Sequence, residues 1–349
     1  MRALRRVEWL GPVMTEGFET VEVAVDHLTE LVDQSLKAIG VPDADVEHIR
    51  DVLMYAQLRG NNQGLVKIPV RAVLSDPDAT PIEITRTLPA VAHIAINGNS
   101  GMVAARSAAI EAANLASTYG VGVVGTSGRA TSTGAMGYYA DLIAREGMVG
   151  IVMAGSVKVM AIAGGVDPDL GTNPIAIGVP TGDVPVVFDM TTAAMAWFGL
   201  IQAQQRDEHI PAGIAYDATG AATNDPGEAM RGATMTFGGH KGSGLALMIE
   251  VMTGPLLGNN IAGDERAQSS GDLFIALNPA ALGGAETFLE RVDALTARVK
   301  AGRKAEGFDE ILLPGERGNR QTAASHETNR LRIDKALYEQ LIELAAGEE

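Results

Sequence analysis

A carboxylate that closes an apolar segment is the first residue in this chain that could do chemistry. Asp189 lies at the end of the run that begins at Val184, and Met190, Thr191 and Thr192 follow it. A lone carboxylate where a buried strand ends is costly unless it has a partner or a function. It is either part of an active site or the cap of a following helix. We favour the site, because α/β proteins carry their chemistry at strand ends and glycine loops.

A glycine-rich loop before an apolar helix is the second candidate. Residues 238–244 read Gly-Gly-His-Lys-Gly-Ser-Gly and lead into the apolar residues 245–252. The free N–H groups and positive dipole end of such a helix, together with Lys241, are suited to bind an anion. The order of residues is not that of a Walker loop. His240 is the only one of six histidines in such a setting.

The third candidate is the polar loop from Arg59 to Pro69. It carries two cations, Arg59 and Lys67, and a row of three amides at residues 61–63. Cations and amide donors together can hold a small carboxylate. The alternative is an ordinary exit from a helix, and composition alone does not separate the two interpretations.

The elements that must position these loops follow from hydrophobic periodicity and turn residues. We expect a strand pair at 174–180 and 184–190, and further strands within 81–97, 148–154 and 271–278. Ser156 then lies at the exit of a strand. We expect helices at 21–39 (capped by Thr20), 43–58, 102–119, 135–145, 192–205, 285–300 and 333–345. Residues 211–227 are expected to form turns and one short strand.

One motif is rejected as a nucleotide fingerprint. Residues 120–125 match G-x-G-x-x-G by letter. That fingerprint must follow a strand and open a helix. Here the match follows a predicted helix and lies within a strand pattern, so we do not expect it to bind a dinucleotide.

Composition excludes several classes of function. The 349 residues include no cysteine, which rules out disulfides and thiol catalysis and fits a cytoplasmic protein. The net charge of −16 without a basic patch argues against nucleic-acid binding. No apolar run is long enough to span a membrane, and no histidine and carboxylate spacing suggests a metal site.

Taken together, the motifs resemble those of the type-2 malate/L-lactate dehydrogenase family, the group that includes sulfolactate and ureidoglycolate dehydrogenases. The matching segments are 164–165 with 171–174, 189–192, 210–211 with 217, 220 and 225–226, 240–242 and 313–317. The resemblance implies a non-Rossmann α/β fold. It implies a three-layer, mixed-sheet NAD(P)-binding domain at 118–299. It further implies a substrate and dimerisation domain made of 20–117 and 300–349, with an arm at 1–19.

The resemblance also implies an activity and roles for residues. Family members are NAD- or NADP-dependent reductases of 2-oxo acids or cyclic imino acids, and they are usually homodimers. The cofactor is expected to meet Ser132, Ser156, Met190, Thr191, Lys241, Glu316 and Arg317. The substrate carboxylate is expected at Arg59, Asn62 and Lys67. The catalytic candidates are Asp189, His240 and Gln63.

The chain departs from the family pattern at two loops. Where the family has Ser-His-Gly, residues 62–64 read Asn-Gln-Gly. Where it has His-Phe-Gly, residues 132–134 read Ser-Thr-Gly. Neutral Gln63 cannot act as a general acid near pH 7. Three interpretations follow: a hydride-transfer enzyme with another proton donor, a reductase of an imine protonated in solution, or a nucleotide-binding relative without that chemistry.

Overall fold

The computed structural model describes residues 19–61, 63–263 and 270–347. The predicted arm at 1–19 falls almost entirely outside the described residues, and so does Asn62.

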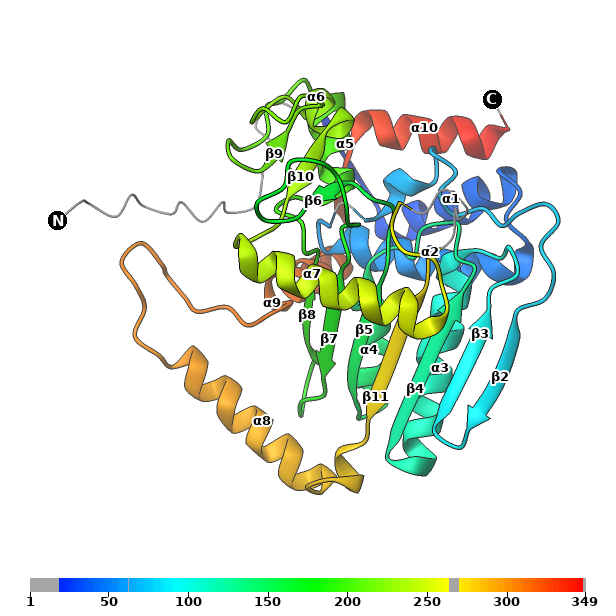
Figure 1. Ribbon diagram of the computed structural model, residues 1–349, viewed down its shortest axis with the longest axis vertical. Coiled ribbons are helices and arrows are strands. Elements are labelled where there is room, and N and C mark those ends of the chain that lie inside the picture. The colour runs from blue at the N-terminus through cyan, green and yellow to red at the C-terminus, as the bar shows by residue number, and fades with distance from the viewer. Residues whose placement is uncertain (1–18, 62, 264–269, 348–349) are drawn as a thin grey trace.

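A seven-stranded mixed sheet forms the centre of the molecule (Figure 1). Across the sheet the strands are β2 (Glu83–Leu88), β3 (Val91–Ala95), β4 (Val121–Ser127), β11 (Asp272–Leu277), β5 (Val149–Ala154), β7 (Ile175–Val179) and β8 (Val186–Met190). Strands β3, β4, β5 and β8 run in one direction, while β2, β11 and β7 run against them. The expected mixed α/β fold is confirmed, and four strands end at the same edge.

Helices cover both faces of this sheet. Helices α3 (Gly101–Tyr119) and α4 (Met136–Arg145) pack on one face, and α7 (His240–Thr253) crosses the other (Figure 1). Side chains alternate along the strands as a pleated sheet requires. Val124 and Phe274 belong to the core on the α3 and α4 side. Met153 and Leu273 pack with Ile249 of α7.

A row of small residues lets α3 and α4 approach the sheet closely. Gly122, Ala276, Gly150 and Gly178 are neighbours across four strands. A Cβ atom at Gly122 would lie 2.0 Å from a carbonyl oxygen of α3, and one at Gly178 would lie 2.1 Å from a carbonyl oxygen of α4. Any larger residue would therefore push the helices away.

The same geometry explains the rejected G-x-G-x-x-G match. Gly120 ends α3 with φ of 81°, Gly122 faces α3, and Gly125 faces Leu257 on the other side of the sheet. All three have packing or turn roles. Residues 121–125 lie within β4, as expected.

The two ends of the chain meet in an outer layer. Strands β1 (Thr20–Val23) and β12 (Leu331–Asp334) pair antiparallel. Helices α1 (Val25–Ala38) and α10 (Lys335–Ala346) pack together, with α2 (Asp43–Leu58) between α1 and the α3 layer. The helix predicted at 21–39 is confirmed from Val25 to Ala38, but its first residues and its Thr20 cap are wrong. Its first residues pair with Leu331 and Ile333 as a strand, and the cap is Ala24.

A smaller unit lies beside the ends of the large sheet. It comprises β6 (Met160–Ala161), β10 (Ala233–Met235), β9 (Ala215–Tyr216), α5 (Trp197–Gln205) and α6 (Pro226–Arg231). The helix expected from Thr192 begins only at Trp197. Before it, the hydroxyl of Thr192 donates to the carbonyl oxygens of Thr172 and Asn173, at 2.9 and 3.1 Å. The segment is therefore anchored to a neighbouring loop and cannot turn into a helix there.

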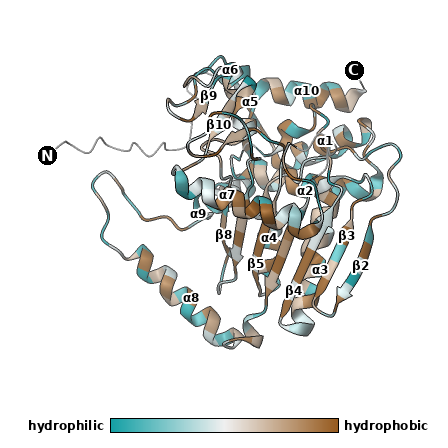
Figure 2. Cartoon of the chain, viewed as in Figure 1, coloured by the Kyte–Doolittle hydropathy of each residue, from teal (hydrophilic) through white to brown (hydrophobic). Residues whose placement is uncertain are grey.

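Helix α8 (Ala285–Lys300) stands apart from the main body (Figure 1). The helix carries both hydrophobic and hydrophilic residues (Figure 2). None of its residues is buried, so its hydrophobic side chains remain exposed. Beyond it, residues 311–315 lead into α9 (Glu316–Thr328), a helix that the sequence analysis did not predict. Short 3-10 turns complete the described fold: η1 (Leu65–Lys67), η2 (Pro255–Leu257) and η3 (Pro279–Ala281).

Candidate active site

Most of the candidate residues gather at the edge where β3, β4, β5 and β8 end. Asp189 and Met190 close β8, Ser156 follows β5 and Ser132 follows β4. Because strands that run in one direction end at one edge, the sheet brings these segments together. The glycine loop joins them through Phe237, whose N–H donates to the carbonyl of Thr192 at 3.0 Å.

Asp189 is held at the start of α4. Its Oδ2 accepts the N–H of Gly137, in the first turn of that helix, at 2.8 Å. A Cβ at Gly137 would lie 2.9 Å from Oδ2, so a larger residue there would displace the carboxyl group. The alternative that Asp189 caps the following helix is wrong, because the N-cap of α5 is Ala196. Instead Asp189 contacts a helix that begins 53 residues earlier in the sequence.

The environment of Asp189 favours its neutral form. The side chain is accessible to solvent, yet it lies so deep among protein atoms that desolvation raises its pKa to about 6. The Gly137 N–H acts in the opposite direction. Within the described residues no cation forms an ion pair with it, so Asp189 is a carboxyl group that titrates near neutrality and that a small molecule can reach.

Tyr55 of α2 lies near Asp189, and Arg59 caps the end of the same helix. Burial raises the pKa of Tyr55 well above its usual range, and the negative charge of Asp189 is among the further contributions. The guanidinium of Arg59 stacks 3.5 Å from the centroid of the Tyr55 ring. It also donates to Oδ1 of Asn319, at 2.9 Å, on α9. Arg59 therefore presents a half-buried cation between α2 and α9, and desolvation lowers its pKa.

The glycine loop has the geometry of an anion site. Gly238 and Gly239 have φ of 56° and 61°, and nothing lies within 4 Å of the position that a Cβ would take at either. His240 and Lys241 open α7 with exposed side chains, and neither makes an ion pair within the part of the chain that the structure describes. The loop thus offers open space, free backbone N–H groups and one cation.

A hydroxyl network fastens the neighbouring loops. Ser156 Oγ accepts the N–H of Thr172 at 2.8 Å, and the hydroxyl of Thr191 donates to the Thr172 carbonyl, also at 2.8 Å. A Cβ at Gly171 would lie 2.3 Å from Ser156 Oγ. The predicted residues Ser156 and Thr191 are therefore brought together, with Met190 half-buried beside them.

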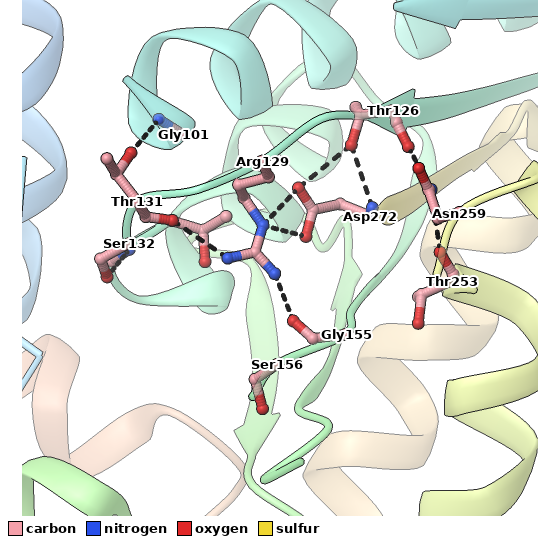
Figure 3. A network of polar contacts seen from close by, with 12 residues as sticks. Gly101, Thr126, Arg129, Thr131, Ser132, Gly155, Ser156, Thr253, Asn259 and Asp272 are labelled. Atoms are coloured by element: carbon pink, nitrogen blue, oxygen red, sulfur yellow. Dashed lines mark hydrogen bonds and ion pairs between the residues drawn. The ribbon is translucent and has the colours of Figure 1, made fainter. Parts of the chain in front are cut away.

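A buried ion pair that the sequence analysis missed underlies this edge (Figure 3). Arg129 Nε donates to both carboxylate oxygens of Asp272, at 2.9 and 3.1 Å, and both side chains are buried. The guanidinium also donates to the carbonyls of Thr131 and Gly155. It therefore holds the loop after β4 and the loop after β5 to the start of β11, with Ser132 and Ser156 as adjacent residues (Figure 3).

Lys67 is a buried cation near the predicted substrate loop's end. Its side chain is 1% exposed, and its Nζ lies 3.5 Å from the centroid of the Phe198 ring on α5. It forms no ion pair with any residue that the structure describes. Burial and then the charge of Arg129 lower the pKa of Lys67 to about 7.

The remaining predicted residues are placed less favourably. Gln63 is half-buried, and its backbone N–H donates to Oδ1 of Asn61 at 2.9 Å. The carboxylate of Glu316 accepts the N–H of Leu313 and pairs with Lys300 and Arg320. It therefore joins α8 to α9, while Arg317 is exposed. No metal-binding cluster of three acidic or histidine side chains occurs within the described ranges.

Comparison with known proteins agrees with this arrangement. The family model for malate/L-lactate dehydrogenase matches residues 23–342. Malate/(S)-sulfolactate dehydrogenase of Methanothermus fervidus is 36% identical over 335 residues, 93% of this chain and 97% of the relative. Delta(1)-pyrroline-2-carboxylate reductase 2 of Burkholderia multivorans is 30% identical, over 95% of this chain and 99% of the relative.

The fold agrees as well. The structure of sulfolactate dehydrogenase from Methanocaldococcus jannaschii superposes with a TM-score of 0.79 and 34% identity, covering 93% of this chain and 97% of that one. The chain is therefore an oxidoreductase of the dehydrogenase and reductase class. It belongs to the malate/L-lactate dehydrogenase family. No helix in the described part of the chain is long and apolar enough to cross a bilayer.

Proposed function

We propose that this protein transfers a hydride between a nicotinamide cofactor, NAD or NADP, and a small 2-oxo or 2-hydroxy acid at the edge formed by Asp189, Ser156 and the glycine loop. The observation that carries the proposal is the convergence of an unpaired, reachable carboxyl group with an open anion site on one sheet edge. A dinucleotide needs the anion site for its phosphates, and proton transfer needs a group that titrates near neutrality.

The residues present fit a dinucleotide. The open space beside Gly238 and Gly239 leaves the backbone N–H groups available to phosphate oxygens, and Lys241 supplies charge. Ser156 and Thr191 would line the remainder of the site, with Ser132 on the neighbouring loop. The bound nicotinamide supplies the hydride. The chain's own residues position the substrate and move its proton.

The substrate side carries cations for a carboxylate. Arg59 and Lys67 occupy the two ends of the loop that the sequence analysis assigned to carboxylate binding. Lys67 is buried and Arg59 is half-buried, and partial removal from water strengthens an interaction with an incoming anion. Asn62 lies between them in the sequence.

A second candidate substrate is a cyclic or linear imino acid. Gln63 occupies the place of the family histidine and cannot donate a proton near pH 7. An imine that is protonated in solution needs no donor, and one relative is named as a pyrroline-2-carboxylate reductase.

One panel separates these alternatives. Purified protein is mixed with 2-oxo acids and cyclic imino acids, each with NADH and with NADPH, and the fall in nicotinamide absorbance is followed. Calorimetry with each nucleotide accompanies it. No binding of either nucleotide would contradict the proposal, and turnover restricted to imino acids would select the second candidate.

We propose further that the protein is a homodimer and that the apolar face of α8 contributes to the interface. Leu295 and Leu282 are 49% and 78% exposed. They line an apolar cavity of about 660 Å³ together with Phe288 and Val149. A second copy would remove this surface from water. Light scattering at micromolar concentration tests the mass, and Leu295→Asp should shift it towards the monomer.

A further inference from the structure

Lys67 is an ammonium group buried at high cost. Lysine side chains are rarely fully buried without a paired charge, and Lys67 is 1% exposed. No carboxylate in the described residues pairs with it. Among the described residues, the Phe198 ring lies 3.5 Å from its Nζ, and the positive charge of Arg129 repels it.

The surroundings hold Lys67 in this position. The 3-10 turn that carries it is fastened to α2, because the N–H of Leu65 donates to Oε1 of Gln57 at 3.3 Å. A Cβ at Gly64 would lie 2.8 Å from the same oxygen. On the other side, Arg129 is locked by Asp272 and Gly155 next to Ser156. Lys67 is part of the predicted substrate loop, and it is therefore fixed against the loops that follow β4 and β5.

Its ionisation suits proton transfer. Burial, followed by the charge of Arg129, lowers the pKa of Lys67 to about 7, so both protonation states are populated at neutral pH. Three elements pack around Lys67. The 3-10 turn contributes an apolar segment, α2 contributes the amide of Gln57, and α5 contributes the ring of Phe198. Arg129 is the charged neighbour, and Asp272 partly neutralises it.

We propose that Lys67 is the proton donor of this enzyme, in the role that a histidine would fill if the loop at 62–64 had the family pattern. The proposal rests on the proposed function. Reduction of a 2-oxo acid adds a hydride to the carbonyl carbon, at the expense of the reduced nicotinamide, and a proton to the carbonyl oxygen. An N–H bond of the Lys67 ammonium breaks, its electron pair stays on Nζ, and an O–H bond forms. Oxidation of the 2-hydroxy acid returns the proton to the neutral amine.

The decisive experiment compares Lys67→Arg with Lys67→Gln. Arginine keeps a cation for the substrate carboxylate but cannot release a proton near pH 7. For the best 2-oxo acid of the panel, Lys67→Arg should keep KM within about threefold and lose roughly 10²–10⁴-fold in kcat. Lys67→Gln should lose both. Lys37→Arg, at an exposed lysine that pairs with Asp43, is the matched control and should change neither.

A second measurement needs no turnover. The chain has seven lysines. With their Cε atoms carbon-13 labelled, one NMR signal should titrate with a midpoint near 7 and be absent from Lys67→Arg. In wild type, kcat for reduction should be level below about pH 7 and fall above it as the donor deprotonates.

The outcomes separate the two proposals. A wild-type protein that reduces no 2-oxo or imino acid overturns the proposed function, and the inference falls with it. If wild type reduces a 2-oxo acid and Lys67→Arg keeps its kcat, the inference alone is overturned. A Lys67 signal that titrates above pH 10 also overturns the inference and leaves the proposed function standing.

Discussion

Two aspartates lie at the same edge of the central sheet in opposite circumstances. Asp272 begins β11 with its carboxylate bound by Arg129 and by the hydroxyl of Thr126, fully out of water. Asp189, near the end of β8, has a single backbone N–H as its partner among the described residues and lies within reach of solvent. The carboxylate of Asp272 is engaged in contacts that hold the fold together. The carboxyl group of Asp189 can still form most of its hydrogen bonds with a ligand.

The difference shows how a fold supports a reactive group. Burial raises the pKa of both carboxyl groups, but Arg129 and Thr126 counteract it at Asp272. At Asp189 only the N–H of Gly137 does so. Arg129 and Asp272 tie together the loops that carry Ser132 and Ser156, so the rigid pair can position the site that the free carboxyl group serves.

The largest effect expected from this contrast is on turnover. Asp189→Asn should lower hydride transfer by roughly 10²–10⁴-fold, a loss as large as that of an acid–base group, because it removes the charge of a carboxyl group that bound substrate and nicotinamide would face. Asparagine is nearly isosteric and can still accept the Gly137 N–H. Asp183→Asn, in the exposed turn before the same strand, is the control. Turnover close to wild type in Asp189→Asn would show that the site has been placed at the wrong residue.

The complementary change should affect stability. Asp272→Asn leaves Arg129 buried without a counter-charge and should lower the free energy of unfolding by about 3–5 kcal/mol. Denaturant titration followed by circular dichroism measures this. Replacing both partners, as in Arg129→Met with Asp272→Leu, should recover part of the loss. If Asp272→Asn were no less stable than Asp189→Asn, the contrast between the two aspartates would be wrong.

An intermediate effect is expected at the glycine loop. Lys241→Ala removes one charge-assisted contact to a phosphate, worth about 1.5–3 kcal/mol, and should weaken nucleotide binding roughly 10–100-fold. His240→Ala, at the adjacent exposed position, serves as the comparison. Calorimetry gives both values. Equal loss in the two variants would mean that the start of α7 matters as a whole and that Lys241 has no special role.

The smallest effect is a dependence of stability on pH. The folded pKa of Asp189, about 6, lies above its value of 3.8 in an unfolded chain. The native state therefore binds more protons between pH 4 and 6, and this group makes the protein less stable as pH rises through that window. The melting temperature of Asp189→Asn minus that of wild type should therefore be higher at pH 8 than at pH 4. A difference that does not change with pH would contradict the raised pKa.

The sequence predicted the features that depend on neighbours along the chain. The antiparallel pair β7 and β8, the glycine loop that opens α7, and the strand setting of residues 120–125 all follow from local periodicity and turn residues. The family resemblance, carried by short motifs in fixed order, is confirmed.

Features that depend on distant partners were not predictable in this way. Residues 20–23 form a strand because Leu331 and Ile333 lie beside them, although their local pattern continues a helix. The pair of Arg129 and Asp272 joins residues 143 apart, and no local signal connects the two. The burial of Lys67 depends on Phe198 of α5, so its sequence surroundings suggested only a polar loop.

The pairing of the two chain ends also has a consequence for how the protein is made. Ser35 of α1 bonds to a carbonyl of α10 that is 306 residues away, and β1 has β12 as its strand partner. On a ribosome, the first helix is synthesised long before this partner exists. The central sheet needs nothing beyond β11 and can form earlier, since domains fold as their segments emerge. The N-terminal elements are completed only by β12 and α10, so truncation of α10 should uncover one face of α1 and expose the nascent protein to aggregation.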